Sequence, residues 1–112
     1  MNNETWIIER GAAVIERKVS DGDVPLTPLD ELIYCLWVTD YGMRNAGDLD
    51  AARDIYKPFQ DEATRLSQAL GLPITQATFN LRRSELEQQY FQLFDDVCNE
   101  IRAVETKEIS RR

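Results

Sequence analysis

Three aspartates between residues 50 and 61 have a spacing that could do chemistry in this chain of 112 residues. Asp50, Asp54 and Asp61 share one face if the segment is helical, and positions four apart rise about 6 Å along the axis. Carboxylates in such a row could imitate DNA phosphates. Basic residues follow each aspartate by three or four positions: Arg53, Lys57 and Arg65. The sequence alone therefore favours a solvated face whose ion pairs contribute roughly 0.3 kcal/mol each.

The residue types present argue against an enzyme or a metal site. The chain has no histidine, which excludes histidine-dependent nucleophiles and imidazole metal ligands. A calcium loop beginning at Asp48 fails, because its fifth, sixth and twelfth positions need an oxygen ligand, glycine and glutamate. Those positions hold Ala52, Arg53 and Phe59. We therefore expect no catalytic residue, no cofactor and no metal.

The net charge of −7 points to a basic protein as the partner. Residues 21–62 hold ten acids and three bases, whereas the rest of the chain holds ten of each, so the excess lies in the middle. Such a chain is repelled by nucleic acid and attracted to a basic protein surface. The acidic face predicted to bind that surface comprises Asp40, Asp48, Asp50, Asp54, Asp61 and Glu62.

No segment has the pattern of a membrane span or a signal peptide. The longest apolar run, residues 32–38, is about a third of the length needed to cross a bilayer. The N-terminal residues lack the basic start and apolar core of a secretory signal. We therefore expect a cytoplasmic protein without membrane contact.

Hydrophobic periodicity predicts a single all-α domain over residues 1–112, a compact bundle of four main helices. The helices are expected at about 4–19, 28–41, 48–70 with a kink near Pro58, and 84–105; residues 72–83 form an uncertain connection. At Pro58 the alternative to a kink is a break so short that both pieces keep one face inward. A turn is predicted around 20–25. The second helix should begin with Thr27 as N-cap and Pro28 at the first helical position. A buried strand is the alternative there, because residues 33–38 are rich in β-formers.

Apolar stripes indicate which residues of these helices are buried. The first helix should bury Ile8, Ala12, Ile15 and Val19. Ser84 and Glu87 have the spacing of a capping box at the start of the last helix. The stripe of that helix is wide, because Tyr90 and Phe91 both belong to it, and a wide stripe could also serve a dimer interface. Cys35 and Cys98 are expected to be buried as small hydrophobic residues.

One stretch, "LTPLDELIYCLWVTDYGMRNAG" at residues 26–47, resembles a family of small helical bacterial proteins that includes a DNA mimic. The family shows an apolar helix, an acid, and an asparagine-glycine-glycine turn. Asp40, Asn45 and Gly47 match it, whereas Ala46 replaces the first glycine and the residues after the turn differ. The later "ALGLP", residues 69–73, is similar to another helix end of the family.

The resemblance implies an acidic, mostly helical and often dimeric protein that occupies the DNA-binding surface of a partner such as a transcription factor. Two other classes fit the same sequence. One is an immunity protein or phage-encoded inhibitor that binds a basic target, because acidic surface also steers a small fold onto such a target. The other is a small dimeric assembly module.

Overall fold

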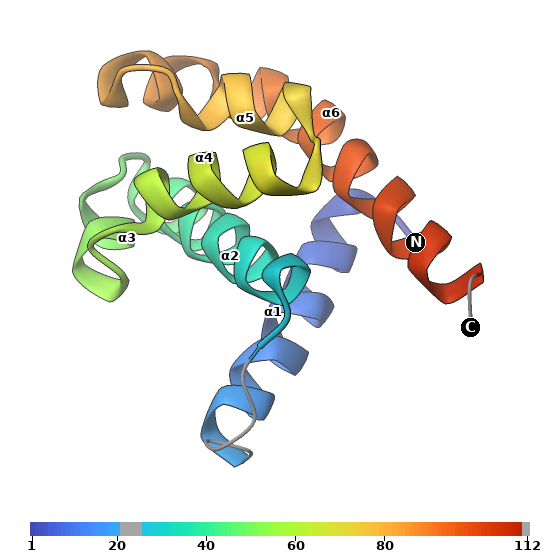
Figure 1. Ribbon diagram of the computed structural model, residues 1–112. Helices are drawn as coiled ribbons and strands as arrows, with labels where there is room; N and C mark the ends of the chain where they lie inside the picture. The colour runs from blue at the N-terminus through green and yellow to red at the C-terminus, as the bar shows by residue number, and fades with distance from the viewer. Residues whose placement is uncertain (21–25, 111–112) are drawn as a thin grey trace.

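Six α-helices make up the described part of the chain, residues 1–20 and 26–110 of a computed structural model, in which no strand occurs (Figure 1). The helices are α1 (Asn3–Ser20), α2 (Pro28–Ala46), α3 (Asp50–Ile55), α4 (Phe59–Leu70), α5 (Pro73–Phe79) and α6 (Arg83–Ser110). The all-helical prediction is confirmed, but four main helices are too few. The predicted helix over 48–70 is two helices, and the uncertain connection contains α5. Of the predicted turn around 20–25, Ser20 still belongs to α1 and residues 21–25 lie outside the described residues.

Helix α2 occupies the centre of the fold and packs against α1, α3, α4 and α6. Figure 1 shows α4 and α5 stacked on one side of α2, while α1 descends on the other. Helix α6 packs on α5 and also contacts α1 and α2. The placement follows from composition, since α2 is apolar on nearly all sides and a helix of that kind needs neighbours around it. None of the helices in the described ranges has the length and apolarity to cross a bilayer.

The start of α2 is the predicted one, but its end is not. Thr27 Oγ1 accepts a hydrogen bond from the Asp30 amide at 3.1 Å, and Pro28 is the first helical residue. The helix runs past Gly42 and ends at Gly47, whose φ of 75° only glycine adopts readily. Gly42 is instead a point of close packing, because a Cβ there would lie 2.9 Å from the backbone nitrogen of Ala52 on α3.

Pro58 divides the predicted long helix, so the short break is the correct alternative and the kink is wrong. Helix α3 ends at Ile55, and Tyr56 has extended backbone angles of φ −149° and ψ 93°. Proline lacks an amide proton and disfavours helical angles in the residue before it, so the chain leaves the helix before Pro58 and re-enters it at Phe59. The apolar stripe keeps its phase across the break, because Ala52, Phe59 and Ala63 are all buried.

The buried side of α1 is not the predicted stripe. The buried residues are Trp6, Ile7, Gly11 and Val14, whereas Ile8 is 53% exposed and Val19 is 80% exposed. Gly11 explains the difference. A Cβ at this position would overlap the ring of Trp37 and lie 2.8 Å from its Cβ. The Trp37 side chain therefore fixes which face of α1 meets α2.

The last helix contributes to the core as predicted but begins differently. Tyr90, Phe94, Val97 and Ile101 are buried, whereas Phe91, which was predicted in the same stripe, is 51% exposed. Cys98 on this helix and Cys35 on α2 are both buried. The predicted capping box does not form, because α6 already begins at Arg83. The Glu87 carboxylate instead accepts a hydrogen bond from the backbone amide of Leu49 at 3.0 Å.

Candidate interaction surfaces

Asp40 belongs to the interior and not to an acidic surface. It is 4% exposed. Its Oδ1 accepts a hydrogen bond from the Tyr90 hydroxyl at 2.7 Å, and the Arg44 Nε lies 3.0 Å from both carboxylate oxygens. Burial raises the pKa of Asp40 despite the opposing effects of Tyr90 and Arg44. The structure therefore corrects the prediction that Asp40 lies on a partner-binding face.

The other predicted acids lie around α3 and the start of α4, among basic side chains. Asp50 pairs with Arg83, and Glu62 Oε2 lies 2.6 Å from the Arg65 Nη2. The remaining acids of this face are Asp48, Asp54 and Asp61.

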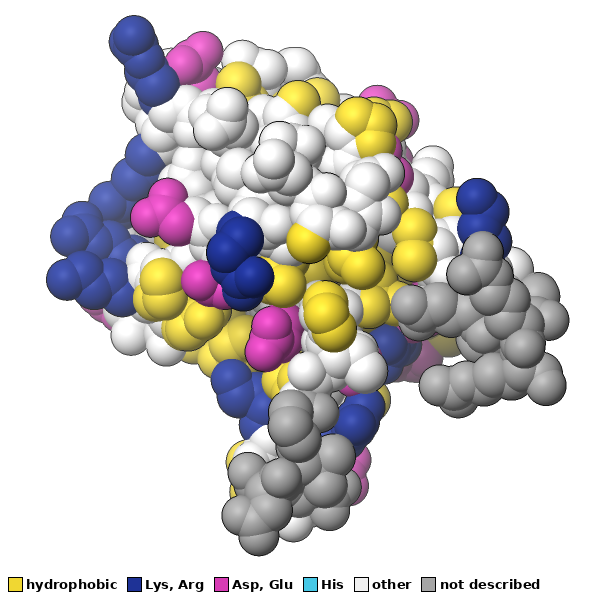
Figure 2. Space-filling view, viewed as in Figure 1, with side chains coloured by type: hydrophobic (Ala, Val, Ile, Leu, Met, Phe, Trp, Pro, Cys, Tyr) yellow, Lys and Arg dark blue, Asp and Glu magenta, His cyan; other side chains and the backbone are white. Residues whose placement is uncertain are grey.

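Basic side chains share the hollows of this face with the acids. Asp50 and Asp54 line a hollow of about 700 Å³ together with Arg53 and Lys57. Lys and Arg side chains gather along the left edge of the view in Figure 2, the side on which Figure 1 places α3. The face thus combines five acids with four bases, Arg53, Lys57, Arg65 and Arg83, and is not a continuous negative surface.

The two turn residues that match the resembling family have local structural roles. Gly47 ends α2, and its amide donates to the Met43 carbonyl at 3.0 Å. Asn45 Nδ2 donates to the Tyr41 carbonyl at 2.8 Å. Asp48 Oδ1 accepts from the Asp50 amide at 3.0 Å and so forms a turn before α3, whose N-cap position is held by Leu49 without a side-chain cap. This stretch joins two helices, and its polar side chains serve that connection.

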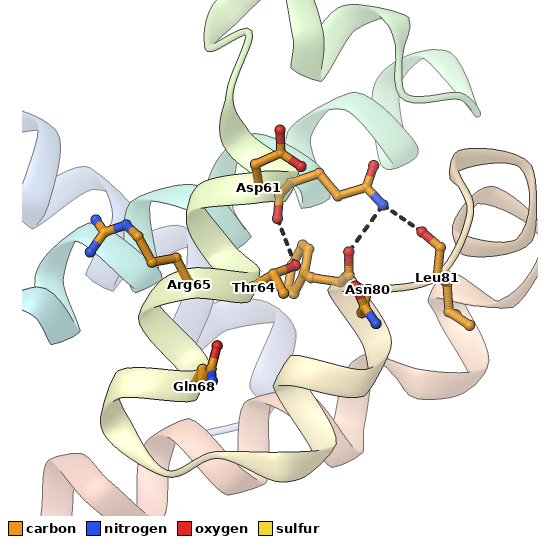
Figure 3. A pocket seen from close by; sticks show the side chains of 8 residues that line it. Asp61, Thr64, Arg65, Gln68, Asn80 and Leu81 are labelled. Atoms are coloured by element: carbon orange, nitrogen blue, oxygen red, sulfur yellow. Dashed lines mark hydrogen bonds between the residues drawn. The ribbon is translucent and has the colours of Figure 1, made fainter.

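A polar groove of about 350 Å³ lies between α4 and α5 (Figure 3). Gln60 Nε2 donates to the carbonyls of Phe79 at 3.0 Å and Leu81 at 2.7 Å, so this amide ties the end of α5 to α4. Figure 3 shows the Asp61 and Arg65 side chains pointing away from each other, and Arg65 pairs with Glu62 instead. The groove does not bring catalytic groups together.

A third surface runs along the contact between α1 and α2, which we call the α1–α2 seam. It comprises Glu4, Ile8, Gly11, Ile15 and Lys18 of α1, and Tyr34, Trp37, Tyr41 and Arg44 of α2. Contacts at both ends and in the middle show that the two rows lie side by side and run antiparallel. Glu4 Oε1 is 3.6 Å from Arg44 Nη1. The Trp37 ring covers Gly11, and Lys18 Nζ lies 3.9 Å from the centre of the Tyr34 ring.

The α2 side of the seam is a row of aromatic rings. The ring centroids of Tyr41 and Trp37 are 5.4 Å apart, those of Trp37 and Tyr34 are 6.3 Å apart, and Tyr56 continues the row at 5.5 Å from Tyr34. Burial raises the pKa of Tyr34 and of Tyr56. Both tyrosines therefore stay neutral at physiological pH, and the row presents uncharged rings.

The seam is open to solvent. Tyr41 is 45% exposed, and Trp37, Tyr34 and Ile15 are half-buried. Ile8 is more than half exposed and falls on the same face of α1 as the contact residues at 4, 11 and 18. Sequence reasoning missed this surface, because the seam forms only where α1 and α2 meet and no pattern within one helix indicates it.

The thiols of Cys35 and Cys98 are unreactive at neutral pH. Burial raises the pKa of Cys35 and of Cys98 to about 12 each, so both stay protonated at neutral pH and neither supplies a nucleophilic thiolate. Within residues 1–20 and 26–110, acids and cysteines nowhere gather in a group of three or more that could hold a metal ion.

Comparisons with protein-family models, curated proteins and solved structures find no match to this chain. The resemblance of residues 26–47 to the DNA-mimic family therefore stays a prediction.

Proposed function

We propose that the protein is a non-enzymatic protein-interaction module and that the α1–α2 seam is the surface that binds its partner. The observation that carries the proposal is the open aromatic row. Tyr, Trp and Arg are the residues most enriched at the energetic centres of protein interfaces. Here Tyr41, Trp37 and Tyr34 stack in succession, and Arg44 lies at one end of the row.

The surroundings of the row also fit an interface. A contiguous exposed apolar patch marks an interaction site more strongly than single exposed apolar residues do. Ile8 and Ile15 extend the aromatic row onto α1, while Glu4 and Lys18 supply charged residues at the two ends. An apolar centre with a charged rim is the usual arrangement of a protein-binding surface.

We do not extend the proposal to DNA mimicry. A mimic needs a continuous row of carboxylates that meets a basic surface. On the α3–α4 face, Arg53 and Lys57 stand between the aspartates, and Asp50 is already paired with Arg83. An immunity-type inhibitor and an assembly module both bind through a protein surface, and the seam would serve either.

Photocrosslinking tests the proposal. A photoreactive amino acid replaces Ile8 in the seam or, as a control, the exposed Gln92 on α6. Irradiation of the full chain, purified and in the host cell, should give a defined protein adduct from position 8 and none from position 92. Adducts from both positions alike, or from neither, would contradict the seam as a binding surface.

A further inference from the structure

We infer that the occupant of the seam is a second copy of this chain, with α1 of one copy antiparallel to α1 of the other. The inference rests on the proposed function, because it names the partner of the same surface. The two-fold axis would lie in the interface and cross both helices at the level of Gly11 and Trp37, where they touch.

The chemistry of the α1 row is self-complementary. A symmetric dimer uses the same patch twice, so the patch must fit itself after a half turn. Read along α1, the row is acid, isoleucine, glycine, isoleucine, base: Glu4, Ile8, Gly11, Ile15 and Lys18. The half turn brings Glu4 opposite Lys18 of the second copy and Ile8 opposite its Ile15. Opposite charges and apolar side chains therefore meet along the whole row.

The α2 row behaves in the same way. The half turn places Trp37 opposite Trp37 of the second copy and Tyr41 opposite Tyr34. Aromatic rings therefore meet aromatic rings on α2, and the charge complementarity comes from Glu4 and Lys18 of α1.

The spacing matches helix-bundle packing. Positions 4, 8, 11, 15 and 18 of α1 alternate steps of four and three, and positions 34, 37, 41 and 44 of α2 do the same. Alternating steps of three and four place residues along the seam of a coiled coil or bundle. An 18-residue helix such as α1 is about 27 Å long, enough for several layers.

The dimer would also account for the incorrect prediction on α1. Ile8, Ala12, Ile15 and Val19 recur with the period of a buried face, yet Ile8, Ala12 and Val19 are exposed in the single chain. Ile8 and Ile15 belong to the seam, and Ala12 and Val19 border it on its outer side. A second copy packed on the seam would cover it.

Solution mass and charge exchange test the inference. The chain of 12.9 kDa should sediment as a dimer of twice that mass. Ile8→Lys should raise the dimer dissociation constant at least about tenfold while leaving the helical circular dichroism unchanged. Glu4→Lys and Lys18→Glu should each weaken the dimer by about fivefold, because the Glu4–Lys18 pair occurs twice in a symmetric dimer. The double variant, in which the two charges are exchanged, should restore the dimer. Failure of the double variant to restore the dimer would overturn the antiparallel arrangement.

Cysteine crosslinking provides a test with a matched control. Ala12 and Ala13 are both exposed neighbours on α1, but only Ala12 lies on the seam side, and the native thiols are buried. Mild oxidation should link two chains through Ala12→Cys and not through Ala13→Cys. The inference would be overturned if the chain stayed monomeric at about 100 micromolar and Ala12→Cys formed no link between two chains. An adduct of position 8 with a different protein would then still support the proposed function, whereas no adduct would overturn both.

Discussion

At the scale of single residues, Gly11 and Trp37 determine how α1 meets α2. The indole occupies the space in which any side chain at position 11 would lie. Gly11→Ala gains helix propensity of about 1 kcal/mol but forces Trp37 to move, and such overpacking typically costs about 1–3 kcal/mol. We expect a net loss in the free energy of unfolding, measured by urea denaturation. The same substitution in a Trp37→Leu background should cost less, and an equal cost in both backgrounds would contradict this explanation.

Asp40 should make the free energy of unfolding fall as the pH rises. Burial raises its pKa above the ordinary 3.8, so the folded state binds this proton more tightly than the unfolded state does. The contribution of Asp40 to stability is therefore full below pH 3.8 and is lost as the pH rises through the raised value.

Denaturation across this pH range tests the effect of Asp40. Asp40→Asn should remove the decline in stability, whereas the exposed Asp54→Asn should leave it in place. A decline of the same size in the Asp40→Asn protein would assign it to another group.

At the scale of helices, signals carried by adjacent residues were predictable and signals between distant residues were not. Thr27 and Pro28 identify the start of α2, and Gly71 with Pro73 identifies the end of α4, because caps depend on local sequence. The end of α2 was misplaced since Gly42 serves a contact with Ala52, ten residues away. The face of α1 was misassigned for the same reason, because nothing in the sequence of α1 indicates that Trp37 of α2 packs against Gly11.

The start of α5 depends on one such distant contact. The Glu100 carboxylate on α6 accepts hydrogen bonds from the amides of Ile74 at 3.0 Å and Thr75 at 2.7 Å. It therefore caps α5 from another helix. Glu100→Ala should lower the free energy of unfolding by about 1 kcal/mol, as other cap losses do. Asp96→Ala, an exposed change on the same helix, should have little effect. Equal stability of the two variants would show that the cap contributes nothing.

At the scale of the whole molecule, folding disperses the acidic excess that the sequence concentrates in residues 21–62. Asp30 and Asp40 are buried with arginines, and Asp50 and Glu62 pair with bases from outside that segment. Charge counted along the chain therefore could not predict charge on the surface. The seam could not be predicted either, because it arises only when two helices meet.

Because folding disperses the acidic charge, we expect the aspartates of the α3–α4 face to contribute little to partner binding. Reversing Asp50, Asp54 and Asp61 to lysine should leave partner binding through the seam unchanged, apart from a modest effect of net charge. Binding can be followed by sedimentation of the triple variant beside the original chain. If the triple variant keeps its helical circular dichroism but loses binding, the α3–α4 face is the binding surface and the seam is not.

The most direct measurement of the central claim is hydroxyl-radical footprinting of the full chain, purified at high concentration and in the host cell. Ile8 and Tyr41 in the seam are about as exposed in the single chain as Phe91 and Ile74 outside it. If a protein partner covers the seam, Ile8 and Tyr41 should be protected several-fold, while Phe91 and Ile74 react as their exposure requires. Equal reactivity of all four side chains would contradict the account.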